Sequence, residues 1–258
     1  MDKPLVLSET ADQIAILTLN HPEKRNALSQ AMLAQLLDHF KSIAVAQSVR
    51  VVILRAAGPA FSAGHDLREL VGGQKEQYQE LFALCTEVME AIRKLPQPVI
   101  AQVHGVATAA GCQLAATCDL VVAAEDASFA TPGVKIGLFC STPAVALARA
   151  VPPKKAMEML LTGNLISARE AERIGLVSRV VPSDQLAEET MNLARQISAA
   201  SSYTIALGKR TFYEQLHLGR PEAYEVACRA MVENAQAADA EEGIRAFLEK
   251  RPPKWSGR

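Results

Sequence analysis

The residues best placed to do chemistry lie in the stretch 106–119, which is rich in alanine and contains Gly111. Small residues let a ligand approach the backbone, and the first N–H groups of a helix have no partner inside that helix. We expect a helix to begin here, with the Ala110 N–H free to donate to an oxyanion. Gln113 follows by three residues, which on a helix is about 4.5 Å along the same face. The stretch therefore predicts an anion-binding helix start with one polar side chain beside it.

Short aliphatic runs on both sides of this stretch predict the buried strands that position it. Between the first two runs, Ser29 is placed to cap a helix with apolar residues at helical spacing. A second amphipathic helix ends before Pro96. Alternating strands and helices indicate an α/β fold. The four aliphatic runs span residues 14–19, 50–54, 98–103 and 119–123.

After residue 130 the pattern is mostly helical, and cap residues mark its boundaries. Thr142 precedes a proline and fits a helix N-cap, while Ser167 begins a capping box and Gly175 is placed to end that short helix. One more short strand is expected at 176–181, followed by amphipathic helices from about Asp184 to the end of the chain. We predict an α/β core over residues 1–195 and a helical region over residues 196–258.

Composition and charge argue against several classes of protein. Of the 258 residues, 49% are hydrophobic and 21% are charged, which is typical of a folded globular chain. The formal net charge is −1, so we expect neither nucleic acid nor an anionic membrane as a partner. No apolar run approaches the length of a membrane span. The locally basic tail from Glu249 to Arg258 fits either a phosphate contact or a solvated surface.

The cysteines and the N-terminal residues predict a compartment. Five cysteines are spread along the chain without a C-x-x-C pair, so neither a disulfide framework nor a metal site is expected. The first residues lack the basic segment and apolar core of a secretory signal. We therefore predict a reduced, cytoplasmic protein.

Several motifs together resemble the crotonase (enoyl-CoA hydratase/isomerase) superfamily, and the resemblance covers nearly the whole chain. It implies a spiral of ββα units followed by C-terminal helices that form homotrimers, with hexamers as pairs of trimers. Residues 129–143 are most similar to a mitochondrial subgroup of the family. The motifs are 21–28 (HPEKRNAL), 61–67 (FSAGHDL), 98–101 (PVIA), 109–114 (AAGCQL) and 242–248 (EGIRAFL).

The resemblance also implies the ligand, an acyl thioester of coenzyme A, with no metal and no permanently bound cofactor. The thioester carbonyl would accept hydrogen bonds from the backbone N–H groups of His65 and Ala110, because fixed donors stabilise the charge of an enolate or tetrahedral species. Phe247 and Lys250 would reach the nucleotide of a neighbouring subunit. The other expected coenzyme A contacts are Lys24, Arg25, Ala63, Gly64, Asp66 and Leu67.

Two positions depart from the family's hydratases, which carry one glutamate three residues after the oxyanion residue and another after the next strand. This chain has Gln113 and Gly133 there. Hydration needs one group to accept a proton from water and another to supply one to the α-carbon, and neither residue does this near neutral pH. Since positioned acids and bases each contribute about 10² to 10⁴ in rate, we expect weak hydratase activity.

Three functions stay open, and each uses the oxyanion donors. The first is residual or unconventional hydratase or isomerase activity, of the lyase or isomerase class, in fatty acid metabolism. The second is decarboxylation of a malonyl-type thioester, and the third is acyl-CoA binding without catalysis. RNA binding has the least support, given the net charge. His104 is expected to serve a turn, and Cys140 would act as a nucleophile only if its surroundings lowered its pKa.

Overall fold

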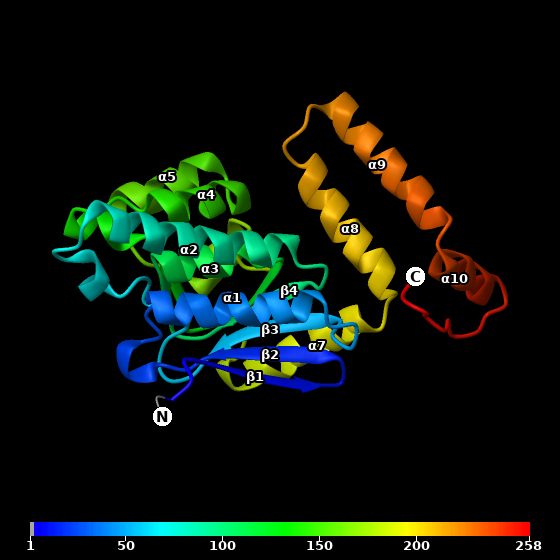
Figure 1. Ribbon diagram of the computed structural model, residues 1–258, viewed down its shortest axis with the longest axis horizontal. Helices are drawn as coiled ribbons and strands as arrows, with labels where there is room; N and C mark the ends of the chain where they lie inside the picture. The colour runs from blue at the N-terminus through cyan, green and yellow to red at the C-terminus, as the bar shows by residue number, and fades with distance from the viewer. Residues whose placement is uncertain (1–2) are drawn as a thin grey trace.

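The computed structural model describes residues 3–258, which form a strand-rich part and a helical extension. Figure 1 shows helices stacked above the strands and the last three helices extending away from them. The strands are β1 (Val6–Ala11), β2 (Ile14–Leu19), β3 (Val51–Ala56), β4 (Val99–Val103), β5 (Val106–Thr108), β6 (Leu120–Ala124), β7 (Ser128–Ala130), β8 (Ile166–Ser167) and β9 (Arg179–Val181).

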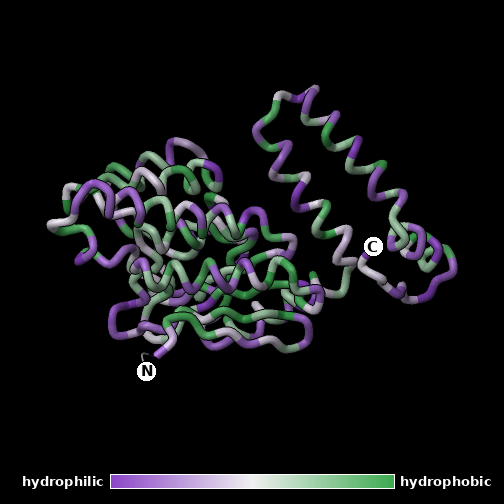
Figure 2. The backbone as a smooth tube through the Cα atoms, viewed as in Figure 1, coloured by the Kyte–Doolittle hydropathy of each residue, from purple (hydrophilic) through white to green (hydrophobic). Residues whose placement is uncertain are grey.

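Two sheets organise these strands. The larger has the order β1-β2-β3-β4-β6-β9 and is parallel apart from the β1–β2 pair. The smaller has the order β5-β7-β8. All six residues of β2 are buried, as expected for a strand in the interior of a sheet. In Figure 2, hydrophobic residues form a band that runs through the strands.

Helices fill the connections and continue beyond the sheets. They are α1 (Gln30–Ala44), α2 (Lys75–Lys94), α3 (Ala110–Thr117), α4 (Ser141–Ala150), α5 (Pro153–Thr162), α6 (Ala168–Arg173), α7 (Leu186–Ser198), α8 (Ser202–Gln215), α9 (Arg220–Ala235) and α10 (Ala238–Leu248). Short 3₁₀ turns are η1 (Pro22–Lys24), η2 (Leu67–Leu70), η3 (Pro132–Ile136) and η4 (Ser183–Gln185). α7 packs against β2, β3, β4 and β6, whereas α8 packs chiefly against α9. The chain thus leaves the sheet after α7.

Most predicted helix boundaries are confirmed, and one is wrong. The Ser29 hydroxyl caps α1 by accepting from the Met32 N–H at 3.3 Å, and the Ser167 hydroxyl accepts from the Glu170 N–H at 3.2 Å. The predicted capping box at Ser167 is only half formed, because the Glu170 carboxylate accepts from Arg173 instead. Thr142 is not an N-cap, because α4 already begins at Ser141. The proline that follows Thr142 is tolerated there, since residues of the first helical turn need no N–H partner inside the helix.

The C-terminal residues fold back on the start of α8. The Asp239 carboxylate is 1% exposed and accepts hydrogen bonds from the Ser201 hydroxyl and from the backbone of Ser256 and Gly257. The Trp255 indole donates to the Ala199 carbonyl at 2.8 Å. These contacts hold the tail, α10 and α8 together. Within residues 3–258, no helix is both long and apolar enough to cross a membrane.

Candidate active site

The segment that carries Lys24 and Arg25 is fixed to the loop that carries His65. The buried Asn26 amide donates to the carbonyls of Ala57 and Ala60, both at 2.8 Å. In return, the Ser62 hydroxyl donates to the Asn26 carbonyl at 2.9 Å. The sequence motifs at 21–28 and 61–67 therefore form one unit in space.

That loop is in turn held against the start of α3. The Thr108 N–H donates to the Ser62 carbonyl at 2.9 Å. Gly64 has φ +94°, and a Cβ there would lie 2.9 Å from the Ala109 Cβ and 3.3 Å from the Ala110 N. A Cβ on Gly111 would lie 2.4 Å from the Ser62 carbonyl oxygen. Both glycines are required because the two loops touch through their backbones.

The two expected oxyanion donors lie on these touching loops. Among the residues that the structure describes, neither the His65 N–H nor the Ala110 N–H has a hydrogen-bond acceptor. Ala110 is the first residue of α3, where a free N–H is expected. The preceding Ala109 has φ +50°, a strained value for a residue with a Cβ, and its N–H donates to the Ala130 carbonyl at 2.9 Å. The fold therefore leaves two neighbouring donors unused.

The His65 side chain supports its own backbone. Its Nδ1 lies 3.1 Å from the Leu28 carbonyl, and since a carbonyl only accepts, Nδ1 carries the proton. The ring stands edge-on to Phe82, and its buried Nε2 has no partner within residues 3–258. Burial lowers the pKa of His65, although the bond to Leu28 opposes this. The imidazole is thus neutral near pH 7 and fixes the loop that presents the N–H.

Gln113 lies in α3, three residues after Ala110. It is 5% exposed, and its Oε1 is buried without a hydrogen-bond partner in the described chain. The side chain lines a cavity of about 440 Å³ between α2, α3, α4 and α8. A buried amide with an unused acceptor beside a cavity can bind a ligand group or a water molecule.

Gly133 lies in a position that is closed to any side chain. A Cβ there would lie 2.0 Å from the Leu138 carbonyl oxygen and 2.8 Å from the Cys140 Sγ. Position 133 therefore has neither a carboxylate nor the space for one. Burial raises the pKa of Cys140, although a backbone hydrogen bond from Gly133 opposes this. The thiol is consequently not activated as a nucleophile.

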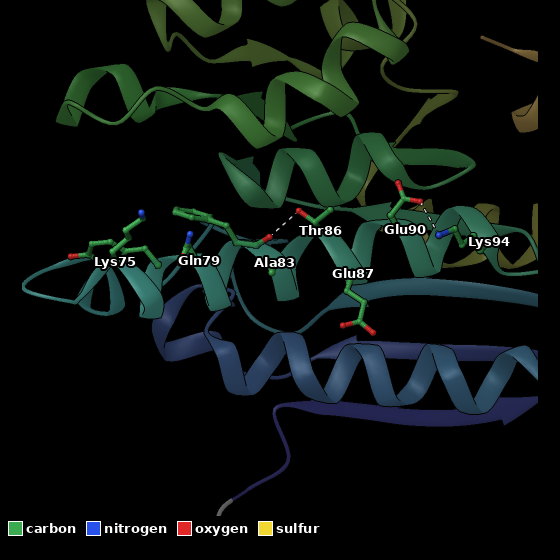
Figure 3. Close-up of a pocket in the computed structure, with 9 residues that line it drawn as sticks. Lys75, Gln79, Ala83, Thr86, Glu87, Glu90 and Lys94 are labelled. Carbon is green, nitrogen blue, oxygen red and sulfur yellow. Dashed lines mark hydrogen bonds and ion pairs between the residues drawn. The ribbon is translucent and has the colours of Figure 1, made fainter. Parts of the chain in front are cut away.

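A second, open depression of about 940 Å³ runs along α2 (Figure 3). Phe82, which contacts His65, lines this depression. Thr86 and Glu90 line both the depression and the cavity that contains Gln113. In Figure 3, the Glu90 carboxylate is paired with Lys94. One face of α2 therefore extends from the residue that contacts His65 to the cavity that contains Gln113.

The predicted coenzyme A contacts near the first two motifs are brought together. Lys24 and Arg25 are exposed, and neither forms an ion pair within residues 3–258. Asp66 caps η2 and is bound by the Arg68 guanidinium, which lowers the pKa of Asp66 to about 2. Gly64 is buried, whereas the other two predicted contacts, Ala63 and Leu67, are exposed.

The C-terminal contacts are not brought to the site by this chain alone. Phe247 is 82% exposed at the end of α10, and Lys250 follows it. Figure 1 shows α10 lying beyond α8 and α9, away from α3. Their role at a neighbouring subunit stays a prediction. In the basic tail, Arg251 is already paired with Glu242 at 2.7 Å.

His104 and Asp119 both form hydrogen bonds that support the fold. His104 Nε2 lies 2.8 Å from the Gly58 carbonyl, which fits the expected role in a turn. Asp119 has a structural role, because its carboxylate accepts hydrogen bonds from Lys209, Tyr213 and the Val99 N–H. The role of Lys209 is not predictable from the sequence, because a lysine in an amphipathic helix resembles any surface lysine.

Comparisons with known proteins agree with this geometry. A family model described as enoyl-CoA hydratase/isomerase matches residues 9–258. The mitochondrial enoyl-CoA hydratase domain-containing protein 3 of Rattus norvegicus is 52% identical over 253 residues, covering 98% of this chain and 84% of that protein. The crystal structure of human enoyl-CoA hydratase domain-containing protein 3 matches with a TM-score of 0.95 at 51% identity. The match covers 98% of this chain and 100% of the human chain.

A solved structure from a bacterium is equally similar. The crystal structure of an enoyl-CoA hydratase from Mycobacterium smegmatis has a TM-score of 0.96 at 50% identity, covering 98% of this chain and 99% of that one. The structural matches confirm the predicted α/β fold, a spiral of ββα units with C-terminal helices. The resemblance of residues 129–143 to a mitochondrial subgroup is confirmed by the similarity to the rat protein over 98% of this chain.

The comparisons also correct one prediction. A cytoplasmic protein was expected from the cysteine pattern and from the N-terminal residues. The similar rat and human proteins are both named mitochondrial, which contradicts that expectation. The prediction failed because unpaired cysteines indicate reducing surroundings but do not distinguish one such compartment from another.

Proposed function

Because the chain belongs to the enoyl-CoA hydratase/isomerase family, we propose that it binds acyl thioesters of coenzyme A and stabilises negative charge on the thioester oxygen. The observation that carries this proposal is the pair of unused N–H donors at His65 and Ala110, on two loops that touch through Gly64. Coenzyme A would enter as part of the substrate, with no permanently bound cofactor.

The donors would act through geometry alone. When a proton or a carboxyl group leaves the α-carbon of a thioester, the electron pair moves onto the carbonyl oxygen and forms an enolate. Backbone N–H groups already aimed at that oxygen stabilise the charge without reorganising, and losing one such donor costs about 10² to 10³ in rate. Lys24 and Arg25, exposed and without ion-pair partners within residues 3–258, would contact the phosphates of coenzyme A.

Efficient hydration is not part of this proposal. Gln113 supplies no carboxylate, and the space next to Gly133 is filled by Leu138 and Cys140. Chemistry that needs no protein acid or base, such as loss of carbon dioxide from a malonyl-type thioester, fits this site better than addition of water. Acyl-CoA binding without turnover fits it equally, and turnover of any thioester would exclude that alternative.

The C-terminal helices support an oligomer. Several large apolar side chains on α8, α9 and α10 are more than half exposed in the single chain, which soluble monomers seldom allow over a contiguous surface. A homotrimer, or a hexamer of two trimers, would cover them. Light scattering of the purified protein measures this mass directly, and a stable monomer contradicts it. The side chains are Phe212, Tyr224, Met231, Val232, Ile244, Phe247 and Leu248.

The direct test combines binding with turnover. Calorimetric titration of the full chain with butyryl-CoA and with free coenzyme A should show tighter binding of the thioester. Addition of crotonyl-CoA, followed by loss of its enone absorbance, should show hydration far slower than in hydratases that carry both glutamates. Failure to bind any thioester contradicts the binding proposal, and fast hydration contradicts the argument from Gln113 and Gly133.

A further inference from the structure

The cavity beside Gln113 lies in the direction that a bound acyl chain would take. Its volume of about 440 Å³ is within the range of small-molecule sites. Ala110, the proposed carbonyl-binding residue, begins α3, and Gln113 lies about one helical turn further along. An acyl group whose carbonyl oxygen is held at the Ala110 N–H would therefore extend past Gln113 into this cavity.

The walls of the cavity combine a mostly apolar surface with several polar and charged side chains. Met89, Val145, Ala146 and Leu216 supply apolar surface. Burying polar wall groups against a plain hydrocarbon would remove their water without replacing its hydrogen bonds. The composition instead fits an acyl chain that ends in a polar group. Besides Gln113, the polar residues along the wall are Thr86, Glu90, Arg93, Thr117, Thr142, Arg149, Tyr213 and His217.

The sign of the charge in the cavity follows from the ion pairs around it. Within residues 3–258, neither Arg93 nor Arg149 is paired with a carboxylate. Glu90 is paired with Lys94 at 3.3 Å and so does not neutralise either guanidinium. The nearby carboxylate of Asp119 is already paired with Lys209 at 2.7 Å. The cavity therefore has an excess of positive charge.

Arg93 is also held in a fixed position. Its guanidinium carbon lies 4.2 Å from the centre of the Tyr213 ring, in a cation–π contact. A stacked guanidinium keeps the N–H groups at its edge available for a planar anion. Arg149 lies on α4, across the cavity from α2, and one of its N–H groups donates to the Val145 carbonyl at 2.9 Å. The two arginines thus approach the cavity from different helices.

We propose that this cavity binds acyl chains that end in a carboxylate, so that the ligands are monothioesters of short dicarboxylic acids with coenzyme A. Arg93 and Arg149 would bind the distal carboxylate through charge-assisted hydrogen bonds, while His65 and Ala110 hold the thioester oxygen. This inference rests on the acyl-CoA binding proposed above. It adds the specificity that a site for ordinary fatty acyl chains would lack.

A pair of matched ligands tests the inference without any mutation. Glutaryl-CoA and pentanoyl-CoA have acyl chains of equal carbon count and differ in the terminal group. Calorimetric titration of the full chain should show glutaryl-CoA binding at least about tenfold more tightly. Equal affinities, or tighter binding of pentanoyl-CoA, overturn the inference while leaving acyl-CoA binding intact. If the chain binds neither thioester, acyl-CoA binding and this inference both fail.

Substitutions at Arg93 and Arg149 test whether these residues bind the distal carboxylate. Arg93→Met and Arg149→Met should each weaken glutaryl-CoA binding about tenfold and change pentanoyl-CoA binding by less than about twofold. Arg169→Met, which removes an arginine paired with Glu172 on the surface, should change neither. An equal loss for both thioesters in the Arg149 variant overturns the inference. Arg149 is exposed, so its variant stays informative even if Arg93→Met disturbs the contact with Tyr213.

Discussion

The ammonium group of Lys209 lies 2.7 Å from the carboxylate of Asp119 and joins α8 to the main sheet. Both side chains are largely buried, at 7% and 13% exposed. Lys209 also donates to the carbonyls of Ile92 and Gln97, while the Tyr213 hydroxyl donates to the other oxygen of Asp119. The ammonium group makes three hydrogen bonds, and both carboxylate oxygens accept at least one, as a buried ion pair requires.

Lys209→Met should destabilise the protein by about 3–5 kcal/mol, because it leaves the Asp119 charge buried without a cation. The free energy of unfolding in urea measures this. Lys41→Met is the matched control, since Lys41 pairs with Glu87 on the surface and both side chains are more than half exposed. That variant should cost about 1 kcal/mol or less. Equal costs for the two variants would contradict the role of the buried pair.

Gly64→Ala should abolish tight thioester binding. The new Cβ would press on Ala109 and on the Ala110 N, so it would separate the two oxyanion donors. Gly72→Ala is the control, because Gly72 also has a positive φ but its Cβ would meet nothing within 4 Å. Both variants should lose about 1–2 kcal/mol of stability from the unfavourable backbone conformation. Only the Gly64 variant should lose affinity for butyryl-CoA in a calorimetric titration.

Gln113→Glu should raise the rate of crotonyl-CoA hydration by up to about 10²-fold, because it restores one carboxylate beside the cavity. Loss of the enone absorbance follows the reaction. Gln113→Met, which has a similar size and no charge, should give no gain. If the glutamate and methionine variants hydrate at the same rate, the substrate does not lie beside position 113.

Gly133→Glu should fail to add the second carboxylate. Its Cβ would overlap the Leu138 carbonyl and the Cys140 sulfur, so the segment from η3 to α4 must move. We expect a clear loss of stability in thermal unfolding and no hydratase activity beyond that of Gln113→Glu alone. A Gly133→Glu protein with wild-type stability would show that this segment is far more adaptable than its packing indicates.

Asp239→Asn should destabilise the protein in a pH-dependent way. Burial would raise the pKa of Asp239, but hydrogen bonds from Ser201, Ser256 and Gly257 outweigh it and lower the pKa. A lowered pKa in the folded state means that the carboxylate adds stability above the unfolded value of about 3.9, and that this stability is lost as the pH falls through the folded pKa.

Urea unfolding at several pH values tests this expectation. The difference between wild type and Asp239→Asn should be about 1–3 kcal/mol near pH 7 and should shrink below about pH 4. The exposed Asp38→Asn is the control and should change stability little at any pH. A difference that grows on acidification would contradict the sign of the shift.

Local patterns predicted much of the fold and part of the site. The cap at Ser29 and the helix start at Ala110 follow from residues a few positions apart, so sequence reasoning could find them. The closure of Gly133 depends on Leu138 and Cys140 folding back over it. The Lys209–Asp119 pair joins residues 90 positions apart. Such contacts depend on how elements pack in three dimensions, which spacing along one chain does not encode.

The filling of the space beside Gly133 has an evolutionary consequence. A single codon change to glutamate at this position would bring a clash before it brought a catalytic benefit. Selection would therefore remove the intermediate unless the Cys140 segment had already changed. The packing around position 133 is thus a barrier to acquiring a carboxylate there, because a second change must come first. Position 113 has no such barrier, because Gln113 already lines a cavity.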